Sequence, residues 1–168
     1  LFSDFNHSTM GHAFPASIGV KAAKPNSDVI CIIGDGGFNM NLQELGTLAL
    51  QNLPIKIFIL NNKTYGLIKQ TQKTWLKSRH VCVDIDSGVA SPDFIKIARA
   101  YNIKTKTIDS HDNIESKIKD VLTYSDGPII CNIIVSENQE ALPKSNFERS
   151  IEDMYPYLSK QELEENMN

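Results

Sequence analysis

Residues 29–37 read VICIIGDGG, a short β-branched apolar run that passes directly into a cluster of glycines. A continuous apolar run of this length predicts a strand that is buried on both faces, as in a parallel sheet. The glycines that follow let the backbone turn sharply and approach a ligand closely. Since ligands of open α/β sheets bind at the carboxyl ends of the strands, this stretch predicts a strand and a site beside it.

The rest of the chain repeats this alternation of apolar runs and helical patterns. Further strands are predicted at residues 55–60, 105–108 and 129–135. The spacing of apolar residues predicts helices at residues 13–23, 42–50, 94–101 and 114–122. Strands that alternate with helices of this size predict an α/β fold with a doubly wound, mostly parallel sheet flanked by helices. Cys31 and Cys131 fall inside predicted strands and are interpreted as small buried hydrophobic residues.

Composition limits the classes of protein to which this chain can belong. Its 168 residues, 41% hydrophobic and 22% charged, are typical of one soluble globular domain with a tail. The net charge of −3 gives no basic surface for nucleic acid, and no apolar run approaches the roughly 20 residues of a membrane helix. Three scattered cysteines give neither a disulfide framework nor a zinc pair, so a reducing cytoplasm is the expected location.

The two ends of the chain differ from its centre. The first residues, LFSD, contain no Met and none of the segments of a signal peptide, so we expect a chain cut from a longer one. From about residue 137 polar residues and prolines dominate, and QELEE at residues 161–165 is acidic. We therefore expect a folded domain at residues 1–143 and a polar tail at 144–168. A short helix is predicted near residues 159–167, and either a solvated or a docking role fits it.

A pair of asparagines, Asn61 and Asn62, follows the predicted strand at residues 55–60. One helical crossover joins this strand to the strand at residues 29–33, so Asp35 and Asn62 can converge on one site. A carboxylate, an amide carbonyl and a backbone carbonyl form an all-oxygen set, which suits Mg²⁺ with phosphates and waters as its other ligands. The helix that starts near Asn41 favours phosphate at the same place. These residues are also common in turns, but together they predict a Mg²⁺-diphosphate site.

The spacing of these groups resembles the diphosphate-anchoring motif of thiamine diphosphate enzymes. That motif is matched by GDG at residues 34–36, 24 further residues (37–60) and the asparagine pair. Several other stretches resemble the acetolactate synthase branch of the family: TMG at 9–11, FPASIG at 14–19, FNMNLQEL at 38–45, NLPIK at 52–56 and ALPK at 141–144. The resemblance covers about residues 5–145. It implies the thiamine diphosphate-binding fold at residues 1–143, with thiamine diphosphate and Mg²⁺ as cofactors.

The resemblance also implies roles for individual residues. Asp35 and Asn62 would bind the metal through their side chains, and Thr64 through its backbone carbonyl. Met10 would be an apolar wedge between the two rings of the cofactor, and the backbone at Ser8 and Met40 would bind its aminopyrimidine ring. The implied cofactor-binding set is Ser8, Met10, Gly34, Asp35, Gly36, Gly37, Phe38, Met40, Asn62, Gly66, Leu67 and Ile68, of which residues 36–38 would lie along the diphosphate. The implied metal-binding set is Asp35, Asn62 and Thr64.

The chain departs from the family pattern at several positions. Family members often have Gly in place of Ser8, although a backbone contact tolerates that change. Acetolactate synthases carry a Trp at the position of Thr71, where it shapes the acceptor pocket, and Trp75 lies four residues further on. The acceptor substrate and the pathway therefore stay open. His12 is interpreted as a structural residue at a helix start, with a substrate contact as the alternative.

In this family a glutamate from a separate N-terminal domain activates the pyrimidine ring across a dimer interface. We expect that glutamate in an upstream pyrimidine-binding domain which, like a central domain, is absent from this chain. Glu44 is interpreted as a solvated or capping carboxylate. No catalytic residue is therefore expected within residues 1–168, and the isolated chain is expected to be inactive.

The implied function is that of the C-terminal cofactor-binding domain of an acetolactate synthase-like enzyme. Such an enzyme decarboxylates a pyruvate-like 2-oxo acid and ligates the remaining fragment to a second carbonyl. The expected partners are the 2-oxo acid and the pyrimidine-binding domain of a second subunit in a homodimer or tetramer, with no nucleic acid and no membrane. One alternative is decarboxylation without carboligation. An alternative from another class is a non-catalytic nucleotide- or metal-binding module of flavodoxin-like shape.

Overall fold

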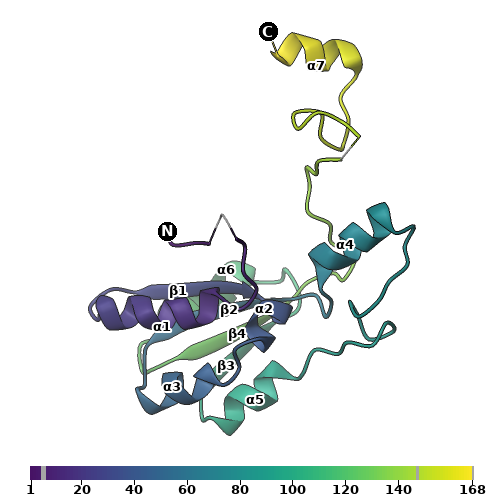
Figure 1. Ribbon diagram of the computed structural model, residues 1–168. Coiled ribbons are helices and arrows are strands. Elements are labelled where there is room, and N and C mark those ends of the chain that lie inside the picture. Colours follow the sequence, from purple (N-terminus) through teal and green to yellow (C-terminus); the bar gives the residue numbers. More distant parts are fainter. Residues whose placement is uncertain (5–6, 147, 168) are drawn as a thin grey trace. The chain divides into compact units, whose positions relative to one another are not determined.

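Four parallel strands form one sheet in the computed structural model, which describes residues 1–4, 7–146 and 148–167. They are β1 (Val29–Gly34), β2 (Ile55–Asn61), β3 (Lys104–Ile108) and β4 (Ile129–Ile134), in the order β1-β2-β4-β3 (Figure 1). The sheet belongs to the first of two units, Leu1–Asn138; the second is Gln139–Asn168. In the register of the sheet Gly34 lies opposite Leu60, so the carboxyl ends of β1 and β2 are level.

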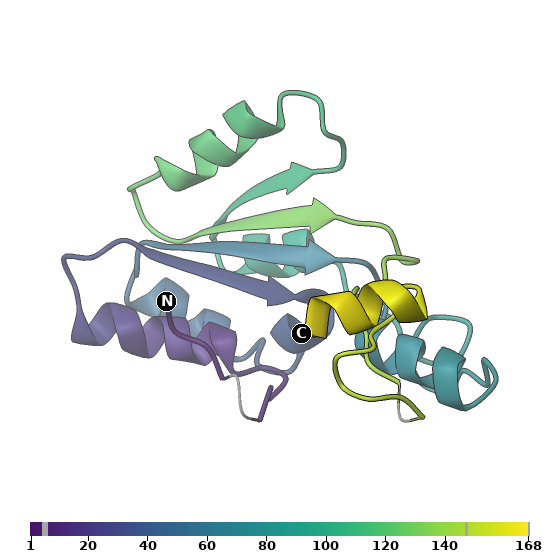
Figure 2. The same ribbon diagram turned by 90° about the horizontal axis from the view of Figure 1, so that it is seen from above.

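Helices cover both faces of the sheet, which confirms the predicted α/β, doubly wound arrangement (Figure 2). One face packs against α1 (Ala13–Ala23), α3 (Glu44–Leu50) and α5 (Phe94–Ala100). The core on this side is centred on three rings: Phe38 lies 5.0 Å from Phe14 and 5.4 Å from Phe94, centroid to centroid. The opposite face packs against α6 (Ile114–Leu122) through a smaller apolar cluster that includes Val121.

The central and edge strands differ in burial. β2 is buried on both faces along nearly all its length, as its apolar run predicts. In β1 the expectation of burial on both faces is wrong, because Ile30 and Ile32 are 51% and 64% exposed. The physical reason is that α6 packs over β3 and β4, and no helix in the described ranges packs over the outer face of β1. Cys31 and Cys131 are buried as predicted, and burial raises the pKa of each thiol to about 11.

Two helices were not predicted by the spacing of apolar residues. The glycine cluster after β1 is the first turn of a short helix, α2 (Asp35–Asn39), and not a tight turn. The helix expected to start near Asn41 is α3, and it begins only at Glu44. The backbone amides nearest the end of β1 therefore belong to α2 and not to α3. The other unpredicted helix, α4 (Gly66–Trp75), extends away from the sheet and has no buried residue (Figure 1).

The predicted bounds of α1 and α6 are those observed, and α5 ends one residue early. Asp93 caps α5, because its carboxylate accepts from the N–H groups of Ile95 and Lys96. Asn113 stands at the N-cap of α6, but its side chain makes no cap hydrogen bond.

The second unit contains the predicted tail helix, α7 (Lys160–Met167). Lys144 and Tyr155 pair through both backbone hydrogen bonds of an antiparallel bridge, at 2.9 and 2.8 Å. Arg149 lies over the ring of Tyr157, with its guanidinium carbon 4.0 Å from the centroid. The proposed end of the folded domain at residue 143 stays a prediction.

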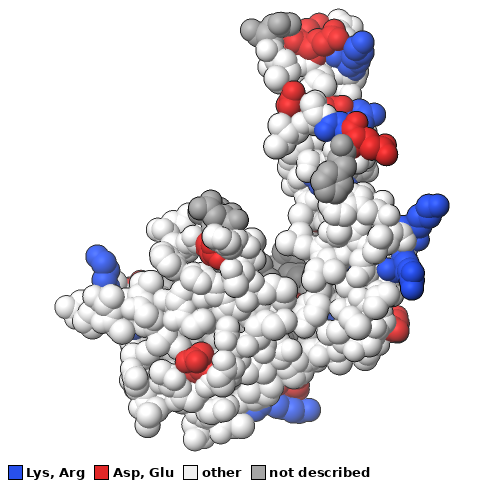
Figure 3. Space-filling view, viewed as in Figure 1, with Lys and Arg blue, Asp and Glu red and all other residues white. Residues whose placement is uncertain are grey.

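On the side seen in Figure 3, the Lys, Arg, Asp and Glu side chains of the first unit are scattered and form no large patch of one charge. None of the helices in the described ranges has the length and apolarity needed to cross a membrane.

Candidate functional site

Asp35 is a buried carboxylate at the carboxyl end of β1. It is the first residue of α2 and only 3% exposed. Its Oδ1 accepts from the Gly36 N–H at 2.8 Å, and its Oδ2 accepts from Ser91 Oγ at 3.1 Å. Burial raises the pKa of this carboxyl group, against the opposing effects of its hydrogen bonds. Burial therefore disfavours the charged form of Asp35, and a cation bound beside it would stabilise the carboxylate.

The turn that follows β2 faces Asp35. The N–H of Lys63 lies close enough to the Asp35 carboxylate to oppose the rise in its pKa, so this turn and α2 meet at one point. Asn62 Oδ1 accepts from the Thr64 N–H at 3.2 Å, which fixes the amide over the turn. The Thr64 carbonyl accepts from the Gly66 N–H at 2.9 Å and keeps a second lone pair. The three residues predicted to hold a metal thus lie on two adjacent strand ends.

Gly36 is the point at which three segments converge. A Cβ at this position would lie 2.5 Å from the ring of Tyr65 and 3.1 Å from Met10 Cε. Only a glycine therefore lets the start of α4 and the turn at residues 9–11 approach α2 this closely. Gly66 has a similar constraint, because a Cβ there would lie 2.8 Å from Asn62 Nδ2.

The opening turn is bound to the end of α2. Asn41 Nδ2 donates to the Gly11 carbonyl at 2.9 Å, and Gly11 has a φ of +90°. A Cβ on Gly11 would lie 2.9 Å from Met40 Cβ, so this turn and Met40 are neighbours. The side chains of Met10 and Met40 are both partly exposed. Ser8 is exposed and has a φ of +50°, and its N–H donates to the Asp4 carbonyl.

Not every predicted residue lies at this convergence. The Phe38 side chain is fully buried in the core, so only its backbone can face a ligand. Leu67 and Ile68 are exposed on α4.

Two further predicted glycines, Gly34 and Gly37, do lie close to the convergence, at the start of α2. A Cβ on Gly37 would lie 3.6 Å from the backbone nitrogen of Gly11.

Three residues that the sequence analysis discussed outside the predicted binding sets make local contacts. Thr71 is exposed on α4, and its hydroxyl donates to the Leu67 carbonyl at 2.9 Å. His12 stacks on Phe2 with a centroid distance of 5.6 Å, and its role stays a prediction. Glu44 accepts from the Thr47 hydroxyl within α3.

A cavity of about 470 Å³ lies at the carboxyl ends of β2 and β4. Its wall includes Asn61 of the asparagine pair. It also includes four residues that the sequence does not mark as part of a site: Lys69, Asp84, Ser91 and Asn132. Asn61 Nδ2 donates to Asn132 Oδ1 at 3.1 Å, and both side chains are buried. Asn132 could have been noticed as the polar residue inside an apolar strand. Ser91 precedes a Pro-Asp helix start and carries no signal of its own.

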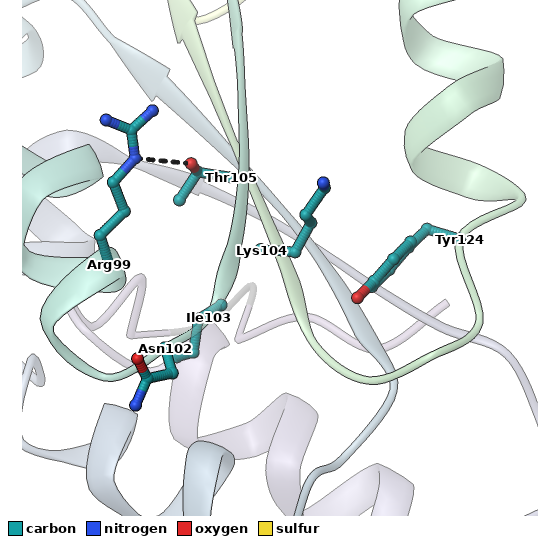
Figure 4. Close-up of a pocket in the computed structure, with 6 residues that line it drawn as sticks. All are labelled: Arg99, Asn102, Ile103, Lys104, Thr105 and Tyr124. Carbon is teal, nitrogen blue, oxygen red and sulfur yellow. Dashed lines mark hydrogen bonds between the residues drawn. The ribbon is translucent and has the colours of Figure 1, made fainter.

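Another cavity, of about 450 Å³, lies where β3 begins (Figure 4). There Arg99 Nε donates to Thr105 Oγ1 at 3.3 Å, near the side chains of Lys104 and Tyr124. This is the amino edge of the sheet, whereas ligands of open α/β sheets bind at the carboxyl edge.

The donor set around Asp35 fits Mg²⁺ bound together with a diphosphate. In the described part of the chain no cationic side chain pairs with Asp35, so the carboxylate is available to a metal ion. Among residues 1–4, 7–146 and 148–167, no three His, Cys, Asp or Glu side chains come together as metal ligands. The set around Asp35 is of a different kind, one carboxylate with amide and backbone oxygens. Mg²⁺ commonly uses such a sparse set when phosphates supply further ligands.

Comparison with known proteins gives a consistent result. Residues 1–133 match the family model for the thiamine pyrophosphate enzyme, C-terminal TPP binding domain. The chain is 42% identical over 135 residues to the acetolactate synthase large subunit of Porphyra purpurea, covering 80% of this chain and 22% of that protein. It is 36% identical to the acetolactate synthase isozyme 2 large subunit of Escherichia coli strain K12, over 80% of this chain and 24% of that protein.

A probable acetolactate synthase large subunit of Methanocaldococcus jannaschii is 42% identical over 135 residues. The chain spans 22 to 24% of the length of these relatives, so the match concerns their cofactor-binding portion alone. The chain therefore belongs to the thiamine pyrophosphate (thiamine diphosphate) enzyme family, as a C-terminal cofactor-binding domain of acetolactate synthase-like enzymes.

Proposed function

We propose that this chain supplies the metal- and diphosphate-binding half of a thiamine diphosphate site. The enzyme would decarboxylate a pyruvate-like 2-oxo acid and join the remaining fragment to a second carbonyl. The observation that carries the proposal is the buried Asp35 carboxylate, which has no cationic partner in the described residues and faces the turn of Asn62 and Thr64.

In this proposal Asp35, Asn62 and Thr64 hold Mg²⁺, through a carboxylate, an amide oxygen and a backbone carbonyl. The backbone of α2 at Gly36 and Gly37 lies along the diphosphate, where glycine allows close approach. The all-oxygen character of the set and the sparse protein coordination support Mg²⁺ as the metal.

Met10 is proposed to orient the cofactor rings, and its partly exposed side chain beside Gly36 supports that role. When bound, thiamine diphosphate supplies the stabilisation of the carbanion that decarboxylation of a 2-oxo acid requires. The residues of this chain bind and orient the cofactor. We propose that a glutamate of a pyrimidine-binding domain, in a partner subunit of a homodimer or tetramer, moves the proton that activates the cofactor.

The acceptor is the less constrained part of the proposal. Thr71 is small and bonds to its own helix, so α4 offers no large aromatic wall at that position. We expect no preference for 2-oxobutanoate over pyruvate as acceptor, since an apolar pocket contact of this size is worth about 1–3 kcal/mol. Decarboxylation without carboligation remains the second candidate, favoured by the same absence of a wall at Thr71. Product analysis decides between them, because acetolactate indicates carboligation and acetaldehyde indicates simple decarboxylation.

Thermal unfolding of the full-length protein tests the proposed cofactor. Thiamine diphosphate with Mg²⁺ should raise the melting temperature, because a ligand at 100 times its Kd stabilises the folded state by about 2.7 kcal/mol. Thiamine diphosphate with EDTA should raise it much less, and flavin mononucleotide with Mg²⁺ should leave it unchanged. Stabilisation by the flavin and none by thiamine diphosphate would instead support a flavodoxin-like binding module.

A further inference from the structure

The loop between α4 and α5 contributes a hydroxyl group to the buried carboxylate of Asp35. Ser91 Oγ donates to Asp35 Oδ2 at 3.1 Å, although the two residues are 56 positions apart in sequence. The other carboxylate oxygen, Oδ1, accepts from the Gly36 N–H at 2.8 Å. Together with the nearby N–H of Lys63, the two bonds fix the plane of the carboxylate and leave it lone pairs for a further ligand.

The same loop also holds Thr64. Residues 83–91, called the strap below, begin at Val83, which is fully buried. The Val83 carbonyl accepts from Thr64 Oγ1 and from the Tyr65 N–H, both at 2.8 Å. The strap therefore contacts two of the three residues that we propose as metal ligands, Asp35 and Thr64.

The strap is anchored close to its first residue. Lys69 Nζ of α4 lies 2.9 Å from Asp84 Oδ2. Ser87 Oγ donates to Asp84 Oδ1 at 2.6 Å and accepts from the N–H groups of Val83 and Asp84. These bonds order the loop before any ligand binds.

The last residue of the strap is held by the core. Ser91 lies two residues before Asp93, the capping residue of α5, and Phe94 follows in the first turn of that helix. Phe94 is buried and packs edge-on against Phe38 at 5.4 Å. Phe38 belongs to α2, the helix that begins at Asp35. The donor and the acceptor of the Ser91–Asp35 bond are thus carried by two helices whose rings pack directly on each other.

We propose that Ser91 is a positioning residue for the metal ion: its hydroxyl holds the Asp35 carboxylate in the orientation that Mg²⁺ requires. The inference rests on the proposed Mg²⁺ site. Without the hydroxyl the carboxylate would rotate about its terminal torsion, and binding of the metal would have to order it. Partners that orient metal ligands in this way typically change metal affinity by about 10–100-fold.

The test is calorimetric titration of Mg²⁺ into the full-length protein in the presence of thiamine diphosphate, which needs no turnover. Ser91→Ala should weaken Mg²⁺ binding by about 10-fold or more. Ser91→Thr, which keeps the hydroxyl, should bind within about threefold of the parent. Ser87→Ala is the matched control, because it removes a serine hydroxyl from the strap and leaves the bond to Asp35. If Ser91→Ala fails to fold, Ser91→Cys keeps the volume, offers only a weak donor and should show the same loss.

The outcomes separate this inference from the proposed function. Mg²⁺ affinity in Ser91→Ala equal to that of the parent overturns the role of Ser91 and leaves the site intact. Equal losses in Ser91→Ala and Ser87→Ala also overturn it, because the order of the strap would then be the cause. A parent protein that binds thiamine diphosphate equally well with and without Mg²⁺ overturns both the inference and the proposed function.

Discussion

Asp84, which is not one of the proposed metal ligands, contacts both Lys69 and Ser87. Hydrogen bonds from Ser87 and then Lys69 lower the pKa of its carboxyl group from 3.8 to about 2. A group whose pKa is lowered by folding stabilises the fold above its unfolded pKa and loses that contribution as the pH falls through its folded pKa. The contribution of Asp84 should therefore be complete above about pH 5 and be lost progressively as the pH falls through the folded pKa of about 2.

Asp84→Asn should lower the free energy of unfolding by about 1 kcal/mol at pH 7. The difference from the parent should shrink between pH 4 and pH 2. Urea unfolding at a series of pH values measures this directly, with Asp86→Asn as the control at an exposed neighbouring position. A difference that stays constant down to pH 2 would show that the charge of Asp84 plays no part.

Asn61 and Asn132 form a buried amide pair between neighbouring strands. Asn132→Leu would leave Asn61 Nδ2 without its acceptor at 3.1 Å. An unsatisfied buried donor costs about 1–3 kcal/mol, so chemical unfolding should show a loss of that size. Asn138→Leu, at an exposed site, should change stability by less than about 0.5 kcal/mol. Parent-like stability of Asn132→Leu would mean that the pair is not formed.

Residue types with a narrow use, such as a carboxylate at the end of a buried strand, allow predictions at the level of single residues. The sequence predicts the convergence of Asp35 with the turn at Asn62, and in the structure the backbone N–H of Lys63 in that turn lies near the Asp35 carboxylate. It assigns no role to Ser91 or Tyr65, because their contacts depend on how a long loop and α4 pack against α2. The roles of all predicted binding residues stay predictions until binding is measured.

At the scale of elements, the close approach of α2 and α4 depends on Gly36. Gly36→Ala would place a Cβ 2.5 Å from the Tyr65 ring and should destabilise the fold by about 1–3 kcal/mol. Gly34→Ala is the matched control, because nothing lies within 4 Å of a Cβ there. Tyr65→Ser should relieve part of the cost, so a double-mutant cycle on unfolding should show coupling. Strict additivity would contradict the contact.

The elements that the sequence predicts well are those with regular apolar spacing, such as α1 and α6. It misses α2, because Gly36 and Gly37 resemble a turn, and α4, because that helix has no buried face to mark it. The exposed outer face of β1 could not be predicted either. An apolar run has the same pattern whether one or both faces of its strand are covered.

At the scale of the whole molecule, the sequence identifies the family and the sheet but not the assembly. The chain matches 22 to 24% of the length of its acetolactate synthase relatives, so its substrates and partner subunits are proposals. The fold of the sheet and the arrangement of the proposed metal ligands arise from contacts within the first unit. Sequence patterns can indicate such contacts. Subunit contacts and the acceptor pocket depend on surfaces that no pattern within this chain specifies.

We expect Asp35 to bind the metal ion that anchors thiamine diphosphate. The most direct measurement is calorimetric titration of thiamine diphosphate into the full-length protein, with Mg²⁺ and with EDTA. The parent and the control Asp28→Asn, whose exposed carboxylate pairs with Lys56, should bind much more tightly with Mg²⁺. Asp35→Asn should bind equally weakly in both conditions, because the one carboxylate of the set is lost. Undiminished Mg²⁺-dependent binding by Asp35→Asn would contradict the account.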